Sequence, residues 1–268
     1  MLAAQNSGMT PDPSRAHVGI VPPLLMLPGL MCDHGFWQPF MDHSKDLICQ
    51  VVDYGDSTTI AAMAEAALAV APAYFSLAGH SMGGRVALAV TRLAPERVHK
   101  LILMGSGYLP LPDGKAGEAE RAGRLALVEI ARQDGVQAMC DQWVKAMVHP
   151  ERLDDAPLIG TIRAMFMRKS AERLARQQQA LLTRPDSTPA LQTLTLPTLV
   201  LGGRQDGWAN VAQHEAMQAL APHAGLAVIE DAGHMMLMER PQATSQAIRN
   251  FLDEMPNAHL KFMQAFLC

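Results

Sequence analysis

The chain has 268 residues, of which 49% are hydrophobic and 18% are charged, and its net charge is −4. These values are ordinary for a globular protein with a sizeable core, built as one large α/β domain or two small ones. Its basic residues are scattered, with no Lys/Arg-rich run of the kind that binds nucleic acid, so no nucleic-acid partner is expected.

The spacing of the cysteines and the composition of two apolar or terminal stretches predict the cellular compartment of the protein. Four cysteines lie far apart without CxxC spacing, so neither a zinc site nor a disulfide framework is indicated and a reduced, cytoplasmic protein is expected. Residues 1–20 lack the charged and apolar regions of a secretory signal and are interpreted as a polar leader. The most apolar stretch, residues 58–74, is too short and too interrupted to span a bilayer, so no membrane partner is expected.

The first half of the chain alternates between two periodicities. Continuously apolar runs predict strands at residues 24–29, 46–55, 73–79 and 99–107. Amphipathic spacing predicts helices at residues 58–71, capped by Asp56 or Ser57, and 82–95. Strands of this kind, alternating with helices, are typical of a parallel sheet that is covered on both faces.

The second half interrupts this alternation and then resumes it. Residues 114–182 show only helical periodicity, which indicates an insertion. Further strands are predicted at 198–206 and 225–231, and helices at 210–220 and 242–252. We therefore expect a core of residues 21–109 and 190–255 with a helical cap of residues 110–189. The apolar tail, residues 256–268, is expected to pack on the domain or in a subunit contact, and the oligomeric state stays open.

One pentapeptide, Gly-His-Ser-Met-Gly at residues 79–83, stands between a predicted strand and a predicted helix. This is the context that the G-x-S-x-G motif requires. A serine on such a sharp turn takes a strained backbone conformation, and its neighbours two residues away must lack bulk. Ser81 would then stand at the carboxyl end of the sheet, where open α/β folds bind ligands, so we predict it to be a nucleophile.

A serine nucleophile needs a base, and the base needs a carboxylate. His234 follows the last predicted strand and Asp206 ends the strand before it, so both project from the edge where Ser81 lies. His80 is adjacent to Ser81 and would point away from it. Asp231 is too close in sequence to His234 to face it comfortably. Chain order Ser81, Asp206, His234 is that of the α/β-hydrolases.

An oxyanion hole would complete the set. The backbone N–H of Met82 follows the nucleophile, and the loop after the first strand offers the N–H of Leu30. With Pro28-Gly29, GHSMGG, GRQD and AGH, residues 24–252 resemble the serine α/β-hydrolases that carry a helical cap. The resemblance implies a mostly parallel sheet of about six strands, and hydrolysis of a small-molecule ester, lactone or thioester through an acyl-enzyme, without metal or cofactor.

The resemblance leaves the substrate open. It extends alike to carboxylesterases, enol-lactonases, carrier-protein methyl-ester hydrolases and C–C bond hydrolases. The family's frequent His-Gly is replaced by Pro28-Gly29, and the HGGGPG-type loop of many C–C hydrolases is absent. Two other classes stay possible on this scaffold: a lyase or cofactor-free enzyme that uses His234 and Asp206 as a base, and a ligand-binding receptor.

The substrate pocket is expected between core and cap. The apolar residues that we expect to line it are Phe36, Trp37, Tyr108, Leu109, Trp143, Met165, Met235 and Met236. Residues 115–184 carry 12 Lys and Arg against 9 Asp and Glu. This local surplus favours a substrate with a carboxylate, although a solvated helix surface would give the same count.

Overall fold

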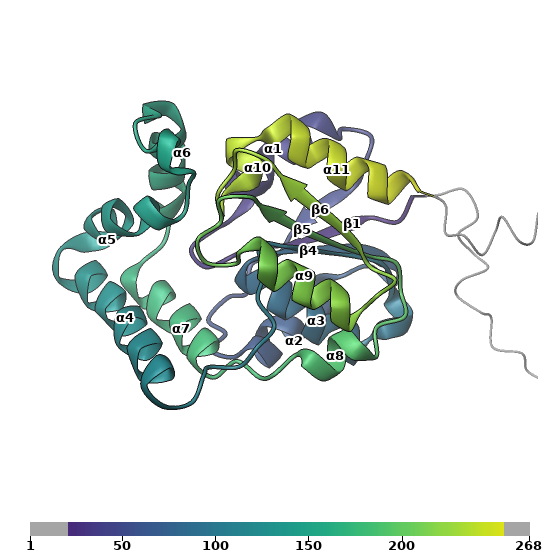
Figure 1. Cartoon of the computed structure of the whole chain (residues 1–268), viewed down its shortest axis with the longest axis horizontal. Coiled ribbons are helices and arrows are strands. Elements are labelled where there is room, and N and C mark those ends of the chain that lie inside the picture. Colours follow the sequence, from purple (N-terminus) through teal and green to yellow (C-terminus); the bar gives the residue numbers. More distant parts are fainter. Residues whose placement is uncertain (1–20, 255–268) are drawn as a thin grey trace, which may run out of the picture.

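The computed structural model describes residues 21–254, and the expected leader 1–20 and tail 256–268 lie outside the described residues (Figure 1). At its centre is one parallel sheet with the order β2-β1-β3-β4-β5-β6, which confirms the prediction of about six strands. The strands are β1 (Leu24–Leu27), β2 (Cys49–Val51), β3 (Phe75–His80), β4 (Val98–Met104), β5 (Thr198–Gly203) and β6 (Gly225–Ile229).

Helices cover both faces of the sheet, as the apolar strands require (Figure 1). One face carries α1 (His34–His43), α10 (Met236–Glu239) and α11 (Pro241–Asp253). The other face carries α2 (Ile60–Val70), α3 (Met82–Leu93), α8 (Thr188–Gln192) and α9 (Val211–Leu220). Short 3-10 helices lie at Pro95–Arg97, Val144–Ala146 and Pro150–Arg152.

Among the helices between β4 and β5, four α-helices lie to one side of the sheet (Figure 1). They are α4 (Gly114–Gln133), α5 (Gly135–Trp143), α6 (Ala156–Met167) and α7 (Ala171–Leu182), and we refer to residues 114–182 as the helical insertion. Every residue of this segment is described and none of it is strand, as its periodicity predicts.

Two local predictions differ from the structure. The cap of α2 is Thr59, whose Oγ1 accepts from the Ala62 N–H at 3.1 Å, and neither Asp56 nor Ser57. The loop expected after the first strand, residues 27–37, contains the first turn of helix α1. The helix begins after Asp33, whose carboxylate accepts from the Gly35 N–H at 2.9 Å.

The strand order places a switch point between β1 and β3. The chain leaves β1 toward β2 on one side and leaves β3 toward β4 on the other. Leu27 at the end of β1 pairs with Gly79 near the end of β3, so the two following loops start beside each other. Ligands of open α/β sheets bind at this point, outside the carboxyl ends of the strands.

Candidate active site

Ser81 occupies the turn between β3 and α3 in a strained conformation. Its φ is 55° and its ψ is −116°, a region that residues other than glycine rarely adopt. Two hydrogen bonds hold the turn: the Ser81 N–H donates to the Met104 carbonyl at 2.8 Å, and the Ser81 carbonyl accepts from the Ser106 hydroxyl at 2.9 Å. The surrounding structure therefore imposes the backbone geometry of the serine.

The glycines on either side of Ser81 are required by close packing. A Cβ on Gly79 would collide with the Gly83 carbonyl oxygen, and a Cβ on Gly83 would collide with the Leu27 carbonyl oxygen. Both obstacles are backbone atoms, which cannot move aside as a flexible side chain would. The requirement for small residues at these two positions, expected from the sequence, is confirmed.

Three of the predicted site residues form a chain of contacts. His234 Nε2 lies 2.9 Å from Ser81 Oγ, and His234 Nδ1 lies 2.7 Å from Asp206 Oδ2. The other carboxylate oxygen of Asp206 accepts from the N–H groups of Trp208 at 2.8 Å and Ala209 at 2.9 Å. His234 and Asp206 are both buried, so the arrangement is shielded from water.

The protonation of this chain follows from its surroundings. Burial raises the pKa of Asp206, but the attraction of His234, its hydrogen bond and the two backbone N–H groups outweigh burial, so the pKa lies below its ordinary value. An ionised carboxylate only accepts hydrogen bonds, so His234 Nδ1 carries the proton that faces Asp206. In the neutral ring Nε2 is then the acceptor, and the Ser81 hydroxyl donates to it.

His80 supports the site from behind. Burial, and then repulsion by His234, lowers the pKa of His80 to about 3, so its ring is neutral. His80 Nε2 donates to the His234 carbonyl at 3.0 Å, and the ring stacks on Phe36 with a centroid distance of 3.9 Å. His80 thus contacts the backbone of His234, and its Nδ1 has no hydrogen-bond partner within residues 21–254.

The two residues whose backbone N–H groups are expected to bind an oxyanion lie at the same cavity as Ser81. Leu30 and Met82 both line it, and within residues 21–254 no protein acceptor takes either N–H. Next to Leu30, Met31 has a φ of 61° and its N–H donates to Gln177 Oε1 at 2.8 Å. A side chain of α7 therefore fixes the loop that carries Leu30.

A buried carboxylate ties the His234 loop to the helical insertion. Glu239 accepts from the Gly233 N–H at 3.0 Å and from the His149 N–H at 2.7 Å. Burial raises the pKa of Glu239 above its ordinary value despite these bonds. The His234 N–H also donates to the Met147 carbonyl at 2.7 Å, so the position of His234 depends on residues 147–149.

A cavity of about 760 Å³ lies over Ser81, between the sheet edge and the helical insertion. Two of the expected lining residues, Leu109 and Trp143, do line it. The others do not: Tyr108 is only partly buried and lies outside the cavity wall, and the remainder pack inside the protein, namely Phe36, Trp37, Met165, Met235 and Met236.

Several lining residues were missed in the sequence. Trp208 stacks on Trp143 at 5.1 Å and its ring centroid lies 5.1 Å from that of His234, so it joins the core to the insertion beside the base. Its position two residues after Asp206 is the one signal that could have pointed to it. Charged residues of the same wall were also missed, namely Arg85, Glu120, Arg124 and Arg184.

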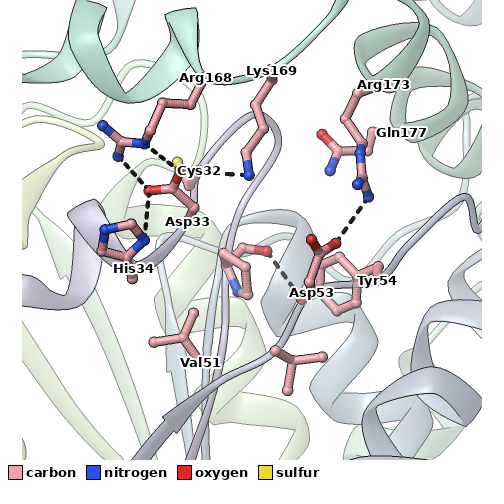
Figure 2. A pocket seen from close by; sticks show the side chains of 12 residues that line it. Cys32, Asp33, His34, Val51, Asp53, Tyr54, Arg168, Lys169, Arg173 and Gln177 are labelled. Atoms are coloured by element: carbon pink, nitrogen blue, oxygen red, sulfur yellow. Dashed lines mark hydrogen bonds and ion pairs between the residues drawn. The ribbon is translucent and has the colours of Figure 1, made fainter.

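A second, smaller cavity of about 330 Å³ lies beside the loop after β1 (Figure 2). Asp33 pairs there with Arg168 at 2.7 Å and with Lys169 at 3.5 Å, and Asp53 pairs with Arg173 at 3.0 Å. Burial raises the pKa of Asp33. The hydrogen bonds from Arg168 and Gly35 and the charge of Lys169 lower the pKa by more than burial raises it, so it lies below its ordinary value. The charges therefore fasten the insertion to the loops after β1 and β2.

Within residues 21–254, no group of three or more His, Cys, Asp or Glu side chains is arranged to hold a metal ion. No helix within these residues has the length and apolar character needed to cross a membrane.

Known proteins similar to this chain are hydrolases. It is 30% identical over 186 residues to the 2-hydroxy-6-oxononadienedioate/2-hydroxy-6-oxononatrienedioate hydrolase of Escherichia coli K12, a match covering 66% of this chain and 61% of that protein. It is 28% identical over 171 residues to 3-oxoadipate enol-lactonase 2 of Acinetobacter baylyi, covering 63% and 60%. Each match thus spans about three fifths of the curated relative.

Solved structures agree in fold. A thermophilic esterase from Thermogutta terrifontis, solved with malate bound, has a TM-score of 0.75 at 28% identity, covering 86% of this chain and 89% of the esterase. The enol-lactonase of Burkholderia xenovorans has a TM-score of 0.76 at 20% identity, covering 88% and 93%, and shows the fold alone. Residues 35–241 match the alpha/beta hydrolase fold family, and the chain belongs to that family.

Proposed function

We propose that this protein is a serine hydrolase that cleaves a carboxylic ester, lactone or thioester of a small molecule through an acyl-enzyme. The observation that carries the proposal is the contact chain from Ser81 through His234 to Asp206, with Ser81 on its strained turn. The cavity of about 760 Å³ over Ser81 has the size of a small-molecule site.

Acylation would begin at Ser81. As its Oγ attacks the acyl carbon, the hydroxyl proton passes to His234 Nε2, 2.9 Å away. The negative charge that develops on the carbonyl oxygen would be bound by the N–H groups of Leu30 and Met82. His234 then returns the proton to the leaving oxygen, the bond to the leaving group breaks, and the acyl group remains on Ser81.

Deacylation repeats these steps with water. His234 Nε2 takes a proton from a water molecule as the water oxygen attacks the acyl carbon, and the same proton goes back to Ser81 Oγ as the acid leaves. Asp206 keeps the proton of His234 on Nδ1 and stabilises the imidazolium during both steps. The ring is thus a base and an acid in turn.

A fluorophosphonate probe tests the nucleophile directly. We expect one adduct at Ser81 by mass spectrometry, and turnover of p-nitrophenyl acetate and butyrate. Both should be lost in Ser81→Ala and in His234→Ala. A folded protein with no adduct at Ser81 and no turnover would refute the proposal and favour a lyase, a cofactor-free enzyme or a receptor.

A second candidate is a C–C bond hydrolase, because the Escherichia coli relative at 30% identity is named for 2-hydroxy-6-oxononadienedioate. The same three residues would serve it. The two candidates separate on substrate: a kcat/KM for 2-hydroxy-6-oxononadienedioate that exceeds that for every simple ester by a hundredfold or more would favour the C–C hydrolase. Activity surviving in Ser81→Ala would instead indicate base chemistry by His234.

The helical insertion and the cysteines bear on how the site is closed and in which compartment the enzyme acts. We treat the helical insertion as a cap, because it closes the cavity over Ser81 with Trp143 and fixes the loop of Leu30 through Gln177. We place the enzyme in the cytoplasm. The free thiols of Cys32, Cys49 and Cys140 support a reducing compartment.

A further inference from the structure

The wall of the cavity over Ser81 carries more positive than negative charge. Three arginines line it, Arg85, Arg124 and Arg184, against a single carboxylate, that of Glu120. A charge in a partly buried site is costly unless it is paired. The charge that is left without a partner in this wall therefore depends on which of the arginines pair with Glu120.

Glu120 is fully occupied by two of the three. Arg184 binds it with both terminal nitrogens, at 2.7 and 2.9 Å, in the bidentate geometry that suits a carboxylate. Arg124 Nε donates to the same carboxylate at 2.8 Å. Burial raises the pKa of Glu120, but these arginines lower it below its ordinary value, so it is ionised and its charge is already shared.

Arg85 is left with no carboxylate partner among the described residues. Its one hydrogen bond goes from Nη1 to the Leu109 carbonyl at 2.8 Å, although a guanidinium has five N–H donors. Burial, and then repulsion by Arg184 and Arg124, lowers the pKa of Arg85 to about 9, so it remains charged at neutral pH. Arg85 is therefore a cation in the cavity wall that an anionic ligand could pair with.

A second polar side chain in the cavity wall is incompletely hydrogen-bonded. Gln178 lines the cavity and is 1% exposed, and its buried Nε2 has no hydrogen-bond partner among the described residues. Its orientation is fixed, because Gln178 Oε1 accepts from Arg124 Nη1 at 2.9 Å and an arginine can only donate. A buried amide donor without an acceptor is costly, and a ligand oxygen would remove that cost.

From these contacts we infer that the cavity binds a carboxylate of the substrate itself, with Arg85 as its principal partner, so that the physiological substrate is an acyl compound that carries a free carboxylate. This inference rests on the proposed function of Ser81 and names the substrate class for it. The positive charge of Arg85 is the group that a carboxylate would pair with, and Gln178 lies in the wall of the same cavity.

The position of Arg85 also sets where the carboxylate lies. Ser81 precedes α3 as its N-cap residue and Arg85 is the fourth residue of that helix, so the two positions lie about one helical turn apart along the chain. The scissile acyl carbon and the carboxylate would therefore sit within one small molecule, separated by a short chain. Half-esters of succinate, glutarate and adipate span that range.

The first experiment uses the unmodified protein and two esters of equal shape. One is the p-nitrophenyl monoester of glutarate, and the other is the same compound with its carboxylate methylated. We expect the free acid to have a kcat/KM about tenfold to a hundredfold higher, as for one charge-assisted contact. Equal values, or a preference for the methyl ester along the succinate, glutarate and adipate series, would overturn the inference.

Variants then assign the effect to Arg85. Arg85→Met should remove the preference for the free acid, chiefly through KM, and Arg85→Lys should keep part of it because the charge remains. Arg92→Met, on the exposed part of the same helix, should keep the full preference. A preference that survives in a folded Arg85→Met would overturn the assignment. Stronger competition by inorganic phosphate than by glutarate would overturn the choice of a carboxylate.

Binding separates this inference from the proposed function. Titration calorimetry with glutarate, and with its diamide as the uncharged control, needs no turnover. Glutarate binding that is weakened tenfold or more in Arg85→Met supports the carboxylate site even if Ser81 is not labelled and no ester is cleaved. Labelling of Ser81 without any glutarate binding or acid preference refutes the carboxylate site and leaves the proposed hydrolase standing.

Discussion

Replacing Asp206 by asparagine should reverse the hydrogen bond to His234. Asp206 Oδ1 accepts from two backbone N–H groups, those of Trp208 and Ala209. The oxygen of an asparagine amide must stay at this position, because an NH₂ group there would face two donors. Its NH₂ group then takes the place of Oδ2 and faces His234 Nδ1, 2.7 Å away in the native protein. The ring must accept at Nδ1 and carry its proton on Nε2.

The size of the effect follows from this change of tautomer. With its proton on Nε2, His234 can no longer accept the hydroxyl proton of Ser81, so the nucleophile loses its base. In serine proteases the corresponding substitution lowers kcat by about 10⁴ while the geometry stays intact. For Asp206→Asn we expect a fall in kcat of about 10³ to 10⁴, or roughly 4 to 5.5 kcal/mol of transition-state stabilisation.

Hydrolysis of p-nitrophenyl butyrate, with circular dichroism to verify folding, measures this loss. Asp231→Asn is the matched control, because Asp231 lies close to His234 in sequence, is exposed and pairs with Arg240 at 3.2 Å. It also has a φ of 53°, which asparagine tolerates well. We expect the control to keep its activity within about twofold. If Asp206→Asn retained a tenth of the native kcat, the argument from the tautomer would be wrong.

Three further predictions concern the supports of the site. Gly79→Ala should destabilise the protein by more than about 3 kcal/mol in urea unfolding, because its Cβ meets the backbone of Gly83. The unfolded chain takes up a proton on His80 that the folded chain, with a pKa of about 3, refuses. Stability is therefore lost as the pH falls, and His80→Gln should reduce that loss by about 1.4 kcal/mol per pH unit between about pH 6 and pH 4. Asp33→Asn keeps the cap of α1 but loses the ion pair to Arg168, so kcat/KM should fall about tenfold through displacement of the oxyanion loop, with less than about 1 kcal/mol lost in urea unfolding.

Each of these has a control or a contrary outcome. Gly160→Ala lies in α6 with open space at its Cβ, so it should stabilise the protein slightly, by roughly 1 kcal/mol or less. Asp42→Asn, at the exposed end of α1, should leave kcat/KM within about twofold. An unchanged acid slope in His80→Gln would contradict a neutral, buried imidazole at that position.

The residues of the contact chain could be placed from sequence because each follows an apolar run. Ser81, Asp206 and His234 come directly or within a few residues after β3, β5 and β6. The carboxyl ends of parallel strands meet at one edge, so a correct set of strands brings the three residues together. Only local periodicity and chain order enter this argument, and both can be read without knowledge of tertiary contacts.

Helix α1 could not be placed in the same way. Gly35 and Pro39 lie within it, and both residue types disfavour a helix interior. Three aromatic side chains on one face, Phe36, Trp37 and Phe40, are completely buried and stabilise the helix through tertiary packing. The start of this helix was therefore included in the loop expected after the first strand, and Phe36 and Trp37 were assigned to the pocket although they belong to the core.

For methionines, the sequence alone does not distinguish a residue that lines the cavity from one that packs in the core. Met235 and Met236 directly follow His234 and Met165 lies in the helical insertion, but each of the three is almost fully buried in the core. An apolar side chain that packs against a cavity wall and one that faces the cavity give the same periodicity. Arg85, which was also missed, lies four residues after Ser81, and this spacing is visible in the sequence.

The surplus of basic over acidic residues at positions 115–184 has two structural origins, which the number of charged residues alone cannot separate. Arg173 and Arg176 bind Asp53 and Asp56 of the core, so part of the positive charge fastens the insertion across the sheet edge. Arg124 and Arg184 instead face inward and share Glu120. Arg124 and Arg184 already pair with Glu120. The positive charge that has no carboxylate partner among the described residues is therefore that of Arg85, on the core helix α3. The electrostatic character of the cavity therefore arises from the contact of the two parts, and neither part alone predicts it.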